Sequence, residues 1–357
     1  MQQIEKLDPN FARPDPEKNL LWYDIRALGV EGRGFDDTKA FYDRLPARAE
    51  GVVPDPVWQL SHMTTGMRVR FVTNATSVSV RWKLTLPELA MPHMPATGVS
   101  GFDLYADHEG TWRYVGVARP RHFPNDEYVL EKSMSAVDRH YLMHLPIYNG
   151  VEEVFVGISK DASIAKAPAY PENLRKPLVV YGGSVVQGSC ASRPGMTYPN
   201  ILGRRLRRTA INMGVSGNGR AEVEMARFLG EIDAAAYVID TLGNMDEPMI
   251  RERMVPFVTA LRTARPKAPI VLVEHFFYPA DIFVPWMKLV HDGYNRELAD
   301  AFAKLTAAGV DNIHLLKGDH LYGHDGDCTV DGTHPTDLGF SRIADAQEPL
   351  LRSLLGA

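Results

Sequence analysis

The chain has 357 residues, of which 45% are hydrophobic and 23% are charged, and its formal net charge is −5. This length predicts two domains, and the acidic balance argues against a nucleic-acid-binding protein. No apolar run reaches the roughly 18 residues that a membrane span needs. Residues 1–6 lack the apolar stretch of a secretory signal, and two cysteines, Cys190 and Cys328, give no disulfide framework. We therefore expect a cytoplasmic protein with free thiols, and the sequence leaves a homo-oligomer open.

The first half of the chain, residues 1–165, has the pattern of a β domain. Residues 67–72 and 77–82 alternate between apolar and polar side chains, which is typical of half-buried strands. Further strands are predicted at 22–25, 101–106, 112–118, 128–132, 140–145 and 151–158. Proline and glycine separate these pieces at short intervals, and helical periodicity is nearly absent. The pattern predicts a β-sandwich of jelly-roll type.

The second half, residues 176–357, alternates short apolar strands with helical patterns. The predicted strands are 178–181, 210–213, 236–240, 270–273 and 312–316. The predicted helices are 198–208, 222–229, 249–264 and 286–308. This alternation predicts a three-layer α/β/α domain with a parallel sheet, whose working site lies at the carboxyl ends of the strands. Residues 160–176 are predicted to link the two domains.

A carboxylate stands three residues before a histidine in Asp331-Gly332-Thr333-His334-Pro335. At this spacing one turn can direct both side chains to a common point, where the carboxylate orients the imidazole and leaves its second nitrogen as a base. Such a pair needs a nucleophile. Ser184 is a candidate, because it follows the strand at 178–181 and the glycine pair Gly182-Gly183.

The segment around Ser184 has other interpretations. It could be a glycine-rich connection or a phosphate-binding loop, although it lacks the Gly-Lys-Ser/Thr of a Walker motif. It also lacks Gly-x-Ser-x-Gly, so an α/β-hydrolase elbow is not supported. Two more polar segments follow strands of this half, Asn212-Met213-Gly214-Val215-Ser216-Gly217 and Thr241-Leu242-Gly243-Asn244-Met245-Asp246.

Taken in order with the Ser184 and His334 segments, these blocks resemble those of the SGNH (GDSL-like) hydrolases, which supply Ser, Gly, Asn and His in that order. The resemblance covers residues 178–346. It implies a flavodoxin-like α/β/α fold, with Ser184 as nucleophile, His334 as general base and Asp331 as the group that orients the base. It also implies an oxyanion hole made by the backbone amides of Ser184 and Gly217 and the side chain of Asn244.

The chain departs from the usual family pattern in two places. The third block often reads Gly-x-Asn-Asp, whereas Gly243-Asn244-Met245-Asp246 has its asparagine one place earlier. The first block reads Gly-Gly-Ser in place of Gly-Asp-Ser. The N-terminal half contains Gly101-Phe102-Asp103-Leu104-Tyr105, which resembles the Gly-x-Asp-Leu-Tyr signature of a branch with an N-terminal β domain. With this motif the resemblance covers most of the chain.

The predicted activity is that of a serine esterase acting on small acyl esters, with acetylated carbohydrates as candidate substrates. No metal or organic cofactor is needed for this chemistry. Two alternatives stay open. One is a carbohydrate- or partner-binding protein with a vestigial hydrolase site. The other is a metal-dependent hydrolase that uses the C-terminal cluster of His314, His320, His324, Asp325, Asp327 and His334.

Overall fold

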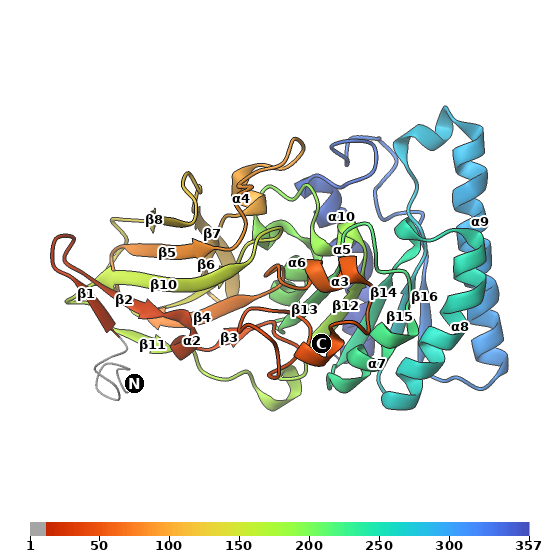
Figure 1. Ribbon diagram of the computed structural model, residues 1–357, viewed down its shortest axis with the longest axis horizontal. Helices are drawn as coiled ribbons and strands as arrows, with labels where there is room; N and C mark the ends of the chain where they lie inside the picture. Colours follow the sequence, from red (N-terminus) through yellow and green to blue (C-terminus); the bar gives the residue numbers. More distant parts are fainter. Residues whose placement is uncertain (1–11, 357) are drawn as a thin grey trace.

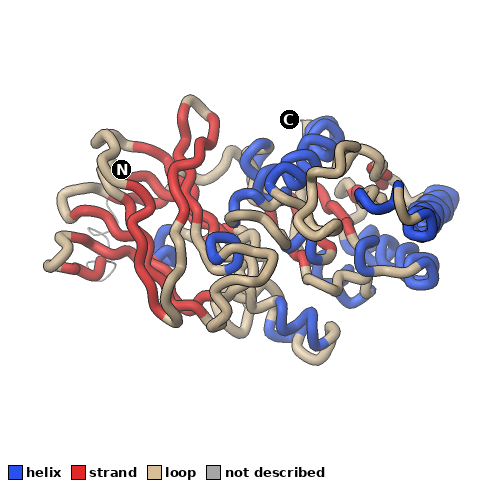
Figure 2. Tube along the Cα trace, turned by 90° about the horizontal axis from the view of Figure 1, so that it is seen from above, coloured by secondary structure: helices blue, strands red, loops and turns tan. Residues whose placement is uncertain are grey.

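The computed structural model describes residues 12–356, so the predictions made for residues 1–11 lie outside the described chain. Two halves lie along the long axis of the molecule, one built of strands and the other of helices around a sheet (Figures 1 and 2). The N-terminal half is a β-sandwich and the C-terminal half an α/β/α domain, which confirms the predicted fold class.

Two sheets form the sandwich. The first has the order β1-β2-β10-β5-β8, with neighbouring strands antiparallel. Its strands are β1 (Ala12–Asp15), β2 (Leu20–Asp24), β5 (Val78–Leu84), β8 (Asn125–Glu131) and β10 (Val151–Ser159). The second has the order β11-β4-β9-β6-β7, and β3 also pairs with β4. Its strands are β3 (Val30–Glu31), β4 (Arg68–Thr73), β6 (Asp103–His108), β7 (Thr111–Val117), β9 (Arg139–His144) and β11 (Ile164–Lys166).

Alternation along the strands explains this core. In β5, Val78, Val80, Trp82 and Leu84 are buried in a cluster that both sheets share, whereas Arg81 and Lys83 on the same strand are less buried. The strands predicted by alternation are present with small shifts at their ends. Strand β11 lies inside the linker predicted at residues 160–176. The prediction of a linker is therefore wrong for the first part of that segment. Three short helices, α2 (Ile25–Leu28), α3 (Asp55–Leu60) and α4 (Ala96–Val99), interrupt this half.

The sheet of the second half is parallel and has the order β13-β12-β14-β15-β16. Its strands are β12 (Leu178–Gly182), β13 (Ala210–Gly214), β14 (Ala236–Asp240), β15 (Ile270–Val273) and β16 (Ile313–Leu316). This is the flavodoxin-like order. The chain first adds β13 on one side of β12 and then adds β14, β15 and β16 on the other side, so the strand order reverses beside β12. The switch point therefore lies at the end of β12, where Ser184 follows.

Helices cover both faces of this sheet. They are α5 (Ser184–Gln187), α6 (Tyr198–Arg205), α7 (Val223–Glu231), α8 (Glu247–Ala264), α9 (Pro285–Ala307) and α10 (Asp337–Leu355). Helices α7, α8 and α9 pack on one face, and α5, α6 and α10 on the other. The sequence did not predict α5 or α10. In residues 12–356, no helix is both long and apolar enough to cross a membrane.

One N-terminal segment belongs to the core of the α/β half. Phe35, Leu45, Val57 and Trp58 are buried in the same cluster as the side chains of α7 and α8. In Figure 1 this segment, including α3, lies beside the sheet of the second half. The two halves are therefore interlocked, and the order of the chain alone does not separate their cores.

Candidate active site

Ser184 occupies the first turn after β12. Gly182 ends the strand, Gly183 follows, and Ser184 begins α5 in a half-buried position. Neighbouring atoms leave no space for a side chain at either glycine. A Cβ atom at residue 182 would lie 1.9 Å from the carbonyl oxygen of Asp240, and one at residue 183 would lie 1.7 Å from Nδ2 of Asn244. The tight exit from the strand thus leaves the serine hydroxyl at the carboxyl edge of the sheet.

His334 links Ser184 to Asp331. Its Nε2 lies 3.0 Å from Oγ of Ser184, and its Nδ1 lies 2.7 Å from Oδ2 of Asp331. An ionised carboxylate can only accept hydrogen bonds, so it fixes the proton on Nδ1 and leaves Nε2 free to accept the serine proton. Ser184, His334 and Asp331 therefore form a continuous chain of hydrogen-bonding contacts, although Ser184 and His334 are 150 residues apart.

The turn itself holds the Asp331 carboxylate. Its Oδ1 accepts the backbone N–H groups of Thr333, at 3.0 Å, and His334, at 2.8 Å. Partial burial would raise the pKa of Asp331, but the hydrogen bonds from His334 and Thr333 outweigh it and lower that pKa to about 2. The hydroxyl of Tyr322 donates to the carbonyl of Thr333 at 2.7 Å. Asp331 is thus ionised and oriented across the neutral pH range.

Asn244 lies directly against the nucleophile turn. Its side-chain nitrogen occupies the space that a side chain at residue 183 would need. The two departures from the usual family pattern therefore meet at one point, since the early asparagine fits only where the residue before Ser184 is glycine. This contact places a side-chain amide against Gly183, one residue before Ser184.

The loop that contains Gly217 packs on the same turn. Gly219 has a φ of +73°, and a Cβ atom there would lie 2.3 Å from the carbonyl oxygen of Gly182. The backbone N–H of Ser216 donates to Oε1 of Gln187 at 2.8 Å. Gly217 itself is exposed and has a φ of +68°, a conformation that favours glycine. The second block of the sequence is therefore tied to the first.

Two further side chains, His93 and Cys190, lie next to His334. The ring of His93 lies 5.9 Å from the ring of His334, measured between centroids. His93 comes from the loop before α4, so the N-terminal half contributes to the site. Burial, with a smaller effect from Asp331, raises the pKa of the Cys190 thiol to about 12. A neutral thiol is no nucleophile at ordinary pH.

The sequence analysis did not single out His93. A lone histidine in a loop rich in methionine and proline, Met91-Pro92-His93-Met94-Pro95, carries no periodic signal. Only its position between two prolines sets it apart.

The Gly-x-Asp-Leu-Tyr motif supports the loop after Ser184. Asp103 is fully buried and accepts from Nη1 of Arg193 at 2.8 Å and from the backbone N–H of Gly195 at 2.8 Å. Tyr105 also bonds Arg193. Burial would raise the pKa of Asp103, but His144 and Arg193 lower it. Arg193 therefore anchors the nucleophile loop to the sandwich.

The C-terminal cluster that the metal-dependent alternative requires does not come together as one site in the described residues. Asp325 pairs with Arg342 through two hydrogen bonds, at 2.7 and 2.6 Å, and His314 on β16 bonds the side chain of Asn312, which directly precedes that strand. In the described part of the chain, the group that could hold a metal ion contains His334 but no other member of that cluster. The alternative of a metal-dependent hydrolase built on these residues thus has no support in the geometry.

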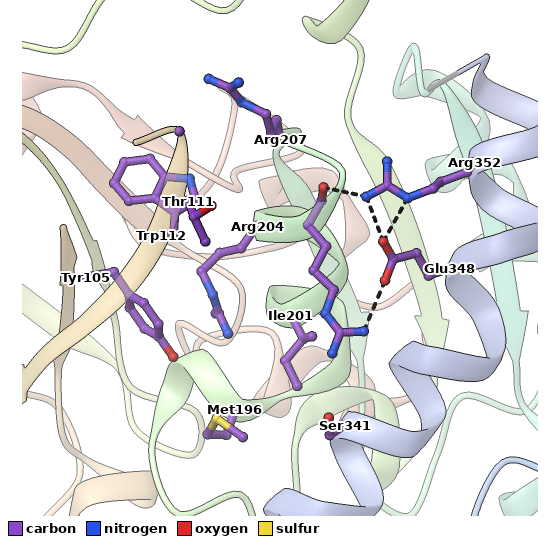
Figure 3. A pocket seen from close by; sticks show the side chains of 12 residues that line it. Tyr105, Thr111, Trp112, Met196, Ile201, Arg204, Arg207, Ser341, Glu348 and Arg352 are labelled. Carbon is purple, nitrogen blue, oxygen red and sulfur yellow. Dashed lines mark hydrogen bonds and ion pairs between the residues drawn. The ribbon is translucent and has the colours of Figure 1, made fainter. Parts of the chain in front are cut away.

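A cavity of about 540 Å³ lies between the two halves, away from Ser184. Figure 3 shows Trp112 and Tyr105 on one wall, and Glu348 and Arg352 of α10 on the other. Arg204 lies over the ring of Tyr105, at 4.1 Å from its centroid. Glu348 accepts hydrogen bonds from Arg352 and Arg205. No residue of the predicted site lines this cavity, so it is separate from the candidate active site.

Comparison with known proteins assigns the family. Residues 175–352 match the model of the GDSL-like lipase/acylhydrolase family, and residues 20–164 match the GxDLY model, described as the N-terminus of SGNH-hydrolase-type esterases. A crystal structure from Bacteroides ovatus, described as a GDSL-like lipase, is 31% identical over 94% of this chain and 98% of that chain, with a TM-score of 0.88. The chain belongs to the GDSL-like lipase/acylhydrolase family, with an N-terminal GxDLY domain.

Membership makes the chain an ester hydrolase, as the sequence predicted. Two more distant structures share the fold. A salicylyl-acyltransferase from a tetracycline biosynthetic pathway has 18% identity, a TM-score of 0.74 and 96% coverage of each chain. A family two carbohydrate esterase from Clostridium thermocellum, in complex with cellohexaose, has 13% identity and a TM-score of 0.58, covering 82% of this chain and 93% of its own. No curated protein sequence matches this chain significantly.

Proposed function

We propose that this ester hydrolase is a serine esterase, with Ser184 as nucleophile, His334 as general base and Asp331 as the residue that orients it. The observation that carries the proposal is the continuous pair of contacts, 3.0 Å from Ser184 to His334 and 2.7 Å from His334 to Asp331. Serine, imidazole and carboxylate in this order define the nucleophilic triad on several unrelated folds. The ionised state of Asp331 supports the same assignment.

The reaction then has two halves. Oγ of Ser184 attacks the ester carbonyl while Nε2 of His334 takes the hydroxyl proton, and a tetrahedral oxyanion forms. His334 returns that proton to the alkoxide as the C–O bond breaks, which releases the alcohol and leaves an acyl-serine. Water, deprotonated by His334, attacks the acyl group next. The acid leaves and Ser184 recovers its proton.

The oxyanion would be held by backbone amides of Ser184 and Gly217 and the side-chain amide of Asn244. Support for Asn244 comes from its position against Gly183, one residue before the nucleophile. Support for Gly217 comes from the bond between Ser216 and Gln187, which ties its loop to α5. Each such donor typically contributes about 100- to 1,000-fold to turnover.

We infer that the substrate carries a small acyl group, and acetylated carbohydrates are the class to test first. The loop with His93 lies close to His334, which limits the room for a long acyl chain on that side. The shared fold with a carbohydrate esterase motivates the choice of sugar esters. A panel of p-nitrophenyl esters of rising chain length, together with acetylated xylose and cellobiose, tests both parts. Turnover that rises from acetate to octanoate would refute the small-acyl assignment.

Ser184→Ala tests the mechanism. Its turnover of p-nitrophenyl acetate should fall by about 10⁶-fold, toward the uncatalysed rate. A fluorophosphonate should label the wild-type protein on Ser184 and leave the variant unlabelled, as read by peptide mass spectrometry. Ser341→Ala, on α10 and away from the triad, is the matched control. Unchanged turnover in Ser184→Ala would remove the serine mechanism.

A further inference from the structure

Four side chains at the candidate active site form a group with the composition of a metal site. They are His93, Cys190, Asp331 and His334, and each offers one ligand atom within 4.8 Å of the other three. They come from three separate segments, the loop before α4, the loop after α5 and the turn before α10. Of these four side chains, the serine mechanism uses only Asp331 and His334. His93 and Cys190 are left without a role in it.

The types of ligand favour one kind of ion. Imidazole, thiolate and carboxylate are the ligands of Zn²⁺, at about 2.0 to 2.3 Å, whereas Mg²⁺ prefers oxygen alone. In a tetrahedron with these bond lengths, ligand atoms lie roughly 3.3 to 3.7 Å apart. The group in this structure is thus about 1 Å wider than a closed zinc site. A shift of about 1 Å among the four side chains would close the gap.

We propose that this group binds Zn²⁺ as a reversible inhibitor of the esterase. Binding releases the proton of the Cys190 thiol to solvent, and the thiolate, the two imidazoles and the Asp331 carboxylate complete the coordination. If His334 binds through Nε2, it loses the lone pair that accepts the serine proton. If it binds through Nδ1, it loses its bond to Asp331. Either way the base is disabled while the ion is present.

The ion is an inhibitor in this scheme and takes no part in ester cleavage. The binding stands on the four side chains alone, whereas its inhibitory effect rests on the proposed function. The two can therefore fail separately. Binding is measured on Ser184→Ala, which retains all four ligands and needs no activity, and inhibition is measured on the wild-type protein.

The binding experiment is a calorimetric titration with Zn²⁺, and with Mg²⁺ as the comparison ion. Ser184→Ala should bind one Zn²⁺ per chain and no Mg²⁺. Changing an outer-shell partner of a metal site typically costs about 10- to 100-fold in affinity, so removing a direct ligand should cost at least about 100-fold. This loss is expected when either His93→Ala or Cys190→Ser is added. His324→Ala and Cys328→Ser are the matched controls, and their zinc affinity should stay unchanged.

Cobalt gives a second, spectroscopic readout, and the zinc affinity of each variant is compared only where its circular dichroism matches that of the wild-type protein. Co²⁺ bound to a thiolate shows a sulfur-to-metal charge-transfer band, which should appear in the wild-type protein and in Cys328→Ser and be missing in Cys190→Ser. Wild-type turnover should fall as buffered Zn²⁺ rises and return on chelation. Each variant is compared with its own turnover without metal.

Either of two results overturns the proposal. One is the absence of zinc binding to Ser184→Ala, and the other is equal zinc affinity with and without His93 and Cys190. If Ser184→Ala retains wild-type turnover, the serine mechanism fails, and the zinc titration still decides the binding.

Discussion

Replacing Gly183 with alanine should disable the site while every member of the triad stays in place. The added methyl group would lie 1.7 Å from Nδ2 of Asn244. Non-bonded carbon and nitrogen atoms lie roughly 3.5 Å apart, so the amide must move by about 2 Å. Oxyanion donors act within a narrow window of about 2.7 to 3.1 Å. The displaced amide therefore leaves the oxyanion hole.

The expected loss follows from that displacement. Removing one oxyanion donor costs about 100- to 1,000-fold in kcat, or roughly 2.7 to 4 kcal/mol of transition-state stabilisation. Gly183→Ala should lose as much as Asn244→Ala, because both changes remove the same donor. The double variant should then be no more than about threefold below either single variant, since the two changes are not independent.

The assay is kcat for p-nitrophenyl acetate in the two single variants, the double variant and a control. Gly243→Ala is the control, because no atom outside its chain neighbours and its own helical turn lies within 4 Å of its Cβ position. It should stay close to wild type. If Gly183→Ala turned over at the wild-type rate while Asn244→Ala was impaired, the contact would not govern the donor. A double variant whose loss equals the product of the two single losses would refute the reasoning as well.

Three other results are expected. Asp331→Asn should lower kcat by about 10⁴-fold, because an amide N–H facing Nδ1 of His334 forces the wrong tautomer. The pKa of Asp331 is lowered to about 2, so its ionised form stabilises the fold above pH ~4. The thermal stability advantage of wild type over Asp331→Asn should therefore vanish as the pH falls from 4 to 2. Arg193→Ala should cost roughly 3 to 5 kcal/mol in urea unfolding, because it leaves Asp103 buried without its cation; an unchanged midpoint would exclude that role.

Local patterns were sufficient to predict most of this fold. Strand β5 alternates because one face packs in the sandwich, and β12 is continuously apolar because helices cover both faces of its sheet. The sequence does not predict helix α10, because Pro349 interrupts its periodic pattern. The segment with Phe35 and Trp58 packs on the other half, and no local period records such a contact.

The same distinction holds for the site. The spacing of Asp331 and His334 is local, so the sequence could predict that they meet, and the structure places them 2.7 Å apart. The position of Ser184 rested on the order of four blocks along a parallel sheet. The contact between Gly183 and Asn244 is tertiary, and in the sequence it showed only as two unexplained departures from a pattern. The catalytic roles of Ser184, His334, Asp331 and Asn244 are predictions that the variants above test.

The β-sandwich half takes part in building the site. Arg44 donates to the carbonyl of Gly214 at 2.7 Å, and Thr65 to the carbonyl of Gln187, also at 2.7 Å. Both acceptors are buried beside the nucleophile turn, where an unpaired carbonyl would cost about 1 to 3 kcal/mol. Together with the bond from Arg193 to Asp103, these contacts tie the end of β13, the end of α5 and the loop after α5 to the first half of the chain. The second half of the chain alone would lack these contacts, so the geometry around Ser184 depends on both halves.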